Sequence, residues 1–217
     1  MSWLLVPHLV RAVPWWPLVG AVSLAILAQL PLLAEEPSGR AVLTGLWLAA
    51  GVLGAAAAFA LPDGMASTVI TPVPRWVRQW LRTGLVVLPA GVVWALLYMA
   101  ARHIAGPEAV GDGLVAGAGI GAGAVGGAGF VVLQAAVCGL LPVAVAAIGA
   151  RYRDTASGAL FGPVAQGMVL VGSLFFSDRA SPWSVPGAGE WTTAHRVWPV
   201  ALVLVLGTLL WGNREPT

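Results

Sequence analysis

Residues 41–61 read AVLTGLWLAAGVLGAAAAFAL, a continuous stretch without a charged side chain. About 20 predominantly apolar residues are enough for one helix to cross a hydrocarbon core of about 30 Å. Further uncharged stretches approach that length at 17–34, 83–101, 130–150, 158–176 and 197–212. The sequence therefore predicts an all-α membrane protein with six transmembrane helices, in which residues 1–217 form a single transmembrane domain.

The composition indicates burial in lipid rather than in a soluble core. Of the 217 residues, 59% are hydrophobic and 9% are charged, against about 25% charged residues in an average soluble domain. Several tryptophans lie near the ends of the predicted spans, as in the aromatic belts of membrane interfaces: Trp15, Trp16, Trp198 and Trp211. Because the usage is rich in Ala, Gly and Arg, as in high-GC bacteria, we expect a multi-pass protein of a bacterial plasma (inner) membrane.

All 11 basic residues are arginines, and the chain has no lysine. A phosphate-binding P-loop needs a lysine for the β- and γ-phosphates, so any ATP hydrolysis must come from another polypeptide. The net charge of +2 on such a hydrophobic chain predicts no nucleic-acid-binding patch. The single cysteine, Cys138, excludes a disulfide framework and a cysteine-based metal site.

The arginines are unevenly distributed between the two sides of the predicted bundle. With the N-terminus inside the cell, the arginines on the cytoplasmic side are Arg11, Arg75, Arg78, Arg82, Arg151, Arg153 and Arg214. Those on the external side are Arg40, Arg102, Arg179 and Arg196. The acidic residues favour the other side, with only Asp63, Asp154 and Glu215 inside. Because cytoplasmic loops carry the excess of positive charge, we predict that both termini are cytoplasmic.

Residues 111–129 leave two interpretations open. Glycine occupies nearly half of these positions, and each Gly costs a helix about 1 kcal/mol relative to Ala, which favours an external loop or a frayed extension of the fourth span. Gly113, Gly117 and Gly121 are nevertheless spaced as a face of small residues that permits close helix contact. The alternative is a helix packed against a partner subunit.

Three segments lie outside the predicted spans. Residues 1–16 combine aromatic, aliphatic and basic side chains and are expected to form a helix in the cytoplasmic interface. Residues 177–196 form the external loop before the last span. Residues 62–82 join spans two and three, and Pro74 suits the first turn of a short helix there.

That short helix places two kinds of side chain on neighbouring faces. Arg75, Arg78 and Arg82 follow one another at i, i+3 and i+7, and Trp76 and Trp80 at i and i+4. A basic face beside an aromatic face suits either lipid headgroups or a docking groove on a cytoplasmic protein. The residues by themselves leave both open.

No charged side chain lies within the predicted spans. Secondary active transporters and proton channels usually need an ionisable side chain inside the membrane, so its absence counts against both functions. Gln29, Gln134 and Gln166 are candidates for interhelical hydrogen bonds or for lining a translocation path. Residues 35–40 match EExxxR, a motif of intramembrane CAAX-protease-like enzymes, but the histidines lie in loops or at interfaces. We therefore predict no catalytic, cofactor-binding or metal site in this chain.

This layout resembles the membrane (permease) subunits of type-two ABC exporters, which export drugs, antibiotics and polysaccharides. The likeness in residues covers 56–94, where FALPDGMAST (59–68) and PVPRWVRQWLR (72–82) are similar to the coupling segment of small actinobacterial members. The resemblance implies that 62–82 is a cytoplasmic segment that couples to an ATPase through Pro74, Arg75, Trp76, Arg78, Trp80 and Arg82. It also implies a second cytoplasmic contact at Arg151 and Arg153. The chain is smaller than most members, and residues 111–129 depart from the family pattern.

The family mechanism implies that two permease subunits, the same or homologous, pair in the bilayer and dock on separate ATPase subunits. ATP and Mg²⁺ would bind to those partners, whose closure would swing the paired bundles between inward- and outward-facing states. This chain would not itself be an enzyme. The alternatives are a non-transporting membrane scaffold or assembly protein, and a channel or facilitator that uses the glycine-rich helix faces.

Overall fold

Helices make up all the regular secondary structure in the part of the chain that the structure describes. The structure is a computed structural model that describes residues 10–11, 13–34, 38–61, 74–106, 127–152, 156–173, 175, 183 and 191–214. Its elements are α2 (Trp16–Leu27), the 3-10 helix η2 (Leu30–Leu33), α3 (Gly39–Ala58), α4 (Arg75–Ala105), α5 (Gly127–Tyr152), α6 (Ala156–Ser173) and α7 (Trp191–Gly212). The prediction of an all-α chain is therefore confirmed for these residues.

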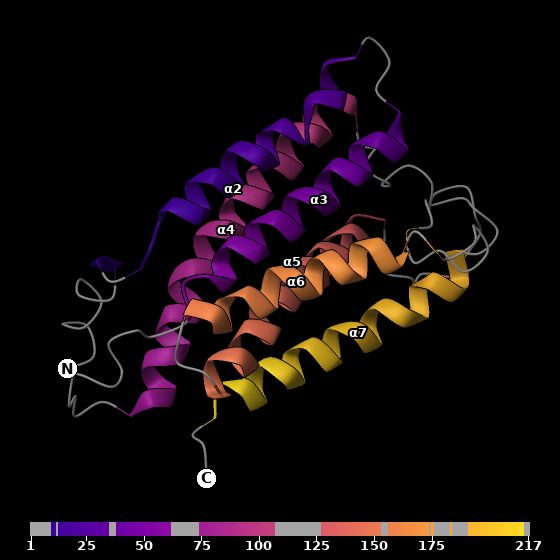
Figure 1. Cartoon of the computed structure of the whole chain (residues 1–217). Helices are drawn as coiled ribbons and strands as arrows, with labels where there is room; N and C mark the ends of the chain where they lie inside the picture. Colours follow the sequence, from indigo (N-terminus) through magenta and orange to yellow (C-terminus); the bar gives the residue numbers. More distant parts are fainter. Residues whose placement is uncertain are drawn as a thin grey trace.

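The helices run alternately up and down in one bundle (Figure 1). Helix α3 packs against α2, α4, α5 and α6, and helix α5 packs against α3, α6 and α7. Helices α3 and α5 therefore form the centre. Helices α2, α4 and α6 begin at one end of the bundle, and helices α3, α5 and α7 end there. We call it the basic end because of the arginines described below.

Four stretches of helix are long and apolar enough to cross a membrane: Trp16–Leu33, Gly39–Ala58, Trp76–Ala105 and Ala128–Tyr152. They overlap the first four predicted spans, and the third stretch is longer at both ends than predicted. The last two predicted spans, 158–176 and 197–212, correspond to α6 and to the apolar helix Val197–Gly212. Lengths and compositions of this kind are those of a multi-pass membrane protein.

Local signals explain several helix ends. Ser38 caps α3, because its side-chain oxygen accepts a hydrogen bond from the Ala41 backbone N–H at 3.3 Å. Helix α2 gives way to the tighter η2 just before Pro31, whose missing N–H removes one backbone bond of a continuing α-helix. Helix α4 ends at Gly106, whose φ of +85° is a conformation that other residues rarely adopt.

Helix α4 differs from the prediction of a separate short helix before span three. Residues 75–82 and the span form one continuous helix of 31 residues. After Pro74 the sequence offers good helix formers such as Arg, Gln and Leu. Pro89 lies inside the helix and does not end it. At about 1.5 Å per residue α4 is about 46 Å long, well beyond the roughly 30 Å of a hydrocarbon core.

Several predicted segments fall largely outside the described residues. They are most of the interfacial segment 1–16, residues 62–73 of the coupling segment, residues 107–126 of the glycine-rich stretch, and most of the external loop 177–196. At the borders of these segments the structure adds two facts. Residues 127–129 belong to the first turn of α5, and residues 191–196, predicted as loop, are the first turns of α7.

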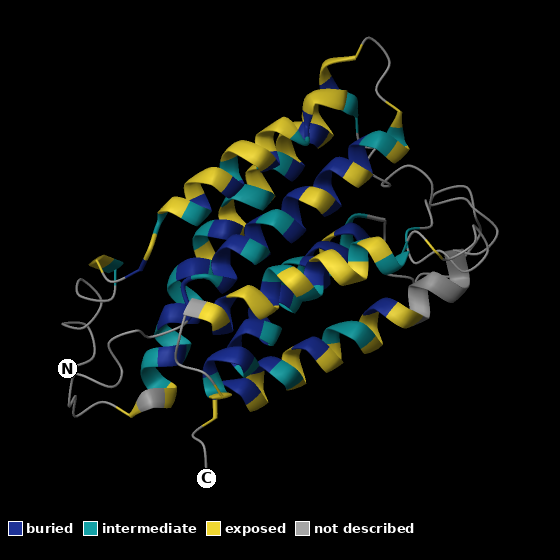
Figure 2. Ribbon diagram, in the orientation of Figure 1, coloured by how far each residue is buried: buried dark blue, intermediate teal, exposed yellow. Residues whose placement is uncertain are grey.

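Glycines bring the central helices close together. A side chain at Gly54 of α3 would overlap the carbonyl of Gly139 in α5. A side chain at Gly162 of α6 would overlap the carbonyl of Pro142 in α5, and one at Gly149 would overlap that of Gly158. Such contacts between backbones are a common way of packing membrane helices. Figure 2 shows burial concentrated on α3 and exposure on the outer side of α2.

Candidate coupling surface

Most of the described arginines gather at the basic end. The arginines there are Arg11, Arg75, Arg78, Arg82, Arg151 and Arg214, whereas Arg40, Arg102 and Arg196 lie at the opposite end. No Asp or Glu occurs among the residues that the structure describes. The uneven distribution read from the sequence is therefore also present in the folded bundle.

The predicted coupling residues occupy different environments along the first turns of α4. Pro74 and Trp76 are exposed, Trp76 to 48%, and Arg78 is half-buried. Trp80 packs against the main hydrophobic core, and Arg82 is only 6% exposed. The side chain of Arg75 lies outside the described atoms.

The basic and aromatic faces predicted for this segment are therefore not both free for a partner. A helix that continues into the bundle must turn one side towards its neighbours, and Trp80 and Arg82 lie on that inner side, beside the buried Gln79 and Thr83. The spacing of the arginines predicted a common face but not the direction in which it points. The residues available to a soluble partner are those at the tip, with Pro74 and Trp76 exposed.

Arg151, predicted as a second cytoplasmic contact, closes the end of α7. Its guanidinium Nη1 donates to the carbonyl oxygen of Trp211 at 2.7 Å and of Arg214 at 3.5 Å. The guanidinium carbon lies 5.0 Å from the centre of the Trp211 ring, a cation–π distance. A cation at a helix C-terminus satisfies carbonyls that have no partner within the helix. Arg153 lies outside the described residues.

The three glutamines of the predicted spans all approach α3. Trp47 donates its indole N–H to Oε1 of Gln134 at 2.9 Å, and Gln134 is only 1% exposed. Gln29 packs over Gly45, where an added Cβ would lie 3.3 Å from both amide atoms. Gln166 packs over Gly51 in the same manner. This arrangement favours helix packing over a translocation path.

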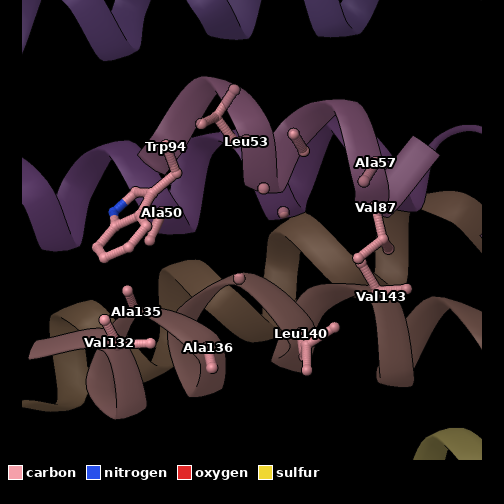
Figure 3. A pocket seen from close by; sticks show the side chains of 14 residues that line it. Ala50, Leu53, Ala57, Val87, Trp94, Val132, Ala135, Ala136, Leu140 and Val143 are labelled. Carbon is pink, nitrogen blue, oxygen red and sulfur yellow. The ribbon is translucent and has the colours of Figure 1, made fainter. Parts of the chain in front are cut away.

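A groove that the sequence did not reveal lies beside α3, between α4 and α5 (Figure 3). Its volume is about 250 Å³, and its fourteen lining residues are apolar or glycine. Ala50, Gly54 and Ala57 of α3 contribute small side chains to the lining. The one polar group, the indole N–H of Trp94, is already bonded to the carbonyl oxygen of Leu46 at 3.0 Å.

Comparison with protein-family models finds no match for this chain, and comparisons with curated proteins and with solved structures find none either.

Proposed function

We propose that this chain is the permease subunit of an ATP-driven ABC-type exporter. In this proposal it has six membrane spans and cytoplasmic termini, and it docks on a separate ATPase at the basic end. The resemblance of residues 56–94 to exporter coupling segments supports the proposal. The uneven distribution of arginine supports the orientation, because cytoplasmic loops are enriched in positive charge.

The observation that carries the proposal is the length of α4. Its 31 residues exceed by about half the roughly 20 residues that cross a bilayer, and the predicted coupling residues lie in the excess at the basic end. A rigid helix moves as a unit, so a push at Trp76 displaces the membrane part of α4 directly. A separate short helix, as first expected, would have needed a stiff joint to transmit the same motion.

The packing of α4 suits such a lever. Helix α4 contacts α3 and, to a smaller extent, α2 and η2. In its apolar span 22% of the residues are buried within the bundle. Trp80 and Arg82 hold its base against the bundle, and Pro74, Trp76 and the half-buried Arg78 lie nearer the tip. We assign partner contact to the tip and helix positioning to the base.

Charge reversal at the tip tests the coupling assignment. The chain is co-expressed with the candidate ATPase, and the complex is isolated for wild type and for Arg75→Glu/Arg78→Glu. Exposed ion pairs contribute up to about 1 kcal/mol each, and reversal adds repulsion, so we expect about a hundredfold weaker association, equivalent to about 3 kcal/mol. Arg102→Glu, an exposed arginine at the opposite end, is the matched control.

A Trp76→Ala variant separates docking from coupling. We expect its complex to form while substrate-dependent ATP turnover falls, because the aromatic contact at the tip is lost. Wild-type association and turnover in both the double reversal and Trp76→Ala would remove the coupling assignment and, with it, the exporter proposal.

The second candidate is a non-transporting membrane scaffold. The burial of Arg82 and the bonding of Arg151 to the end of α7 favour it, because both arginines then serve the bundle itself. In that case the double reversal leaves every partner complex intact, and the purified chain shows no ATP-dependent transport with any co-expressed ATPase.

A further inference from the structure

The groove between α4 and α5 lies at membrane depth and is open at its rim. It extends along α4 from Val87 to Trp94, inside the stretch Trp76–Ala105 that is apolar enough to span a membrane. Gly91 lines the groove and is exposed, and a Cβ added there would meet no atom within 4 Å. Val132, on the α5 side, is 46% exposed. The groove is therefore accessible from the side, where lipid surrounds a membrane protein.

The size of the groove selects among apolar occupants. An α-helix with its side chains is about 10–12 Å wide, too wide to enter a space of about 250 Å³. A hydrocarbon chain is narrower than a helix and can lie along the open groove with part of its length. The lining offers it no polar group that would be left without a partner.

The charge near one end of the groove identifies the headgroup that such a chain would carry. The buried Arg82 precedes Val87 on α4 by about 7.5 Å along the helix, and the half-buried Arg151 follows Val143 on α5 by about 12 Å. Arg151 is bonded to neutral carbonyls, which leave its positive charge in place. Six of the arginines that the structure describes lie at this end of the bundle, and no acidic residue is among the residues described there. Basic groups at this level of a membrane protein attract anionic lipid headgroups.

We propose that the groove binds one acyl chain of an anionic phospholipid whose phosphate lies at the basic end. The hydrocarbon contact supplies the fit of shape. It supplies little preference among lipids, because every lipid tail is as apolar as the groove. The arginines supply the preference for negative charge.

Lipid binding to purified chain, measured by native mass spectrometry, tests this proposal. The chain is stripped of lipid in detergent and titrated with phosphatidylglycerol or phosphatidylcholine of the same acyl composition. We expect one phosphatidylglycerol to bind at least about tenfold more tightly than phosphatidylcholine, as for one or two arginines acting on a headgroup. Equal affinity for the two lipids would overturn the assignment of the headgroup.

Filling the groove tests its location. Gly91→Phe places a ring in the groove without a clash of its Cβ, and Gly207→Phe makes the same change on the exposed side of α7, where a Cβ likewise meets nothing within 4 Å. We expect Gly91→Phe to weaken phosphatidylglycerol binding by about tenfold or more and Gly207→Phe to leave it unchanged. An unchanged thermal unfolding midpoint shows that both variants are folded.

A phosphatidylglycerol with a photoreactive diazirine in its acyl chain gives a second readout. Crosslinks should map to the α4 and α5 residues that line the groove and disappear in Gly91→Phe. Lipid binding that is unaffected by Gly91→Phe would overturn the proposal. A dimer that is lost in Gly91→Phe while lipid binding persists would also overturn it, because a second copy of the chain would then occupy this site.

Discussion

Helices α3 and α4 have nearly the same hydropathy and opposite surroundings. The mean hydropathy of the most apolar part is 1.9 in α3 and 2.0 in α4, yet 72% of that part is buried within the bundle in α3 and 22% in α4. Hydropathy therefore decides that a helix enters the membrane and leaves open whether protein or lipid covers it. Both environments accept apolar side chains equally well.

What separates the two helices is how their glycines are used. Gly45 and Gly54 in α3 lie so close to a neighbouring backbone that an added Cβ would collide with it, and a Cβ at Gly51 would meet the side-chain amide of Gln166. In α4, a Cβ at Gly84 or Gly91 would meet nothing within 4 Å. Small residues stabilise a membrane bundle where backbones approach, and α3 is the helix that four others approach.

The largest expected effect comes from enlarging a glycine at the centre. Gly54→Leu forces α3 away from α5, because even its Cβ would overlap the Gly139 carbonyl. We expect a loss of more than about 4 kcal/mol in the free energy of unfolding, or no folded protein. Unfolding of the detergent-solubilised chain by added SDS measures it. Gly84→Leu in α4 is the matched control and should be neutral or slightly stabilising, since Leu favours a helix over Gly. Equal losses in the two variants would contradict the comparison.

Truncating one leucine in each helix should give the next largest difference. Leu46 of α3 is fully buried, whereas Leu96 of α4 is 65% exposed. Leu46→Ala leaves a cavity, and we expect a cost of about 2–5 kcal/mol. In Leu96→Ala lipid takes the place of the lost carbons, so the cost should stay within about 0.5 kcal/mol. The same unfolding assay compares them, and a cost above 2 kcal/mol for Leu96→Ala would show that protein, rather than lipid, covers α4.

A smaller effect is expected from the hydrogen bond between α3 and α5. Gln134→Leu removes the acceptor of the Trp47 indole N–H. Interhelical hydrogen bonds in membranes average about 0.6 kcal/mol and reach about 1.7 kcal/mol, and this one is buried, so we expect about 1 kcal/mol. A double-mutant cycle with Trp47→Phe isolates the pair. Strict additivity of the two single changes would mean that the bond contributes nothing.

The smallest effect concerns the bond that ties α4 to α3. Trp94→Phe removes the donor to the Leu46 carbonyl, which remains bonded within its own helix. We expect about 0.5 kcal/mol or less in the free energy of unfolding, at the low end of interhelical bonds. A cost larger than that of Gln134→Leu, measured side by side, would reverse the ranking of the two interfaces.

Much of the fold could be predicted from uncharged length alone. The predicted spans 41–61 and 130–150 lie within three residues of α3 and α5 at each end, because charged or turn-forming residues flank them. The helix at residues 75–82 was predicted as separate from the span at 83–101, and the structure joins the two in α4. The arginines of its first turns indicated the end of the membrane segment, although they do not interrupt the helix. A charged residue indicates where a helix leaves the lipid, but it does not indicate where the helix itself ends.

The candidate site was less predictable than the helices. The arginine spacing in residues 75–82 indicated a common face, but only the packing of α4 shows that Trp80 and Arg82 turn inward. Arg151 was expected to meet a partner, which stays a prediction, and the structure adds that it is bonded to carbonyls about 60 residues later in the chain. The groove lined by α3, α4 and α5 has no sequence signature, because each of its residues is an ordinary member of an apolar helix.

The amino-acid sequence by itself determined that the chain is helical, that its apolar helices have the length of membrane spans, and that positive charge gathers at alternate loops. These properties depend on composition and spacing along one segment at a time. Only the tertiary structure decided that α3 is central, that α4 is peripheral, which arginines are engaged within the bundle, and where a groove remains. In a membrane both faces of a helix are apolar, so hydrophobic periodicity does not indicate which face of a helix packs against the bundle. Contacts between backbones at a few glycines determine that face instead.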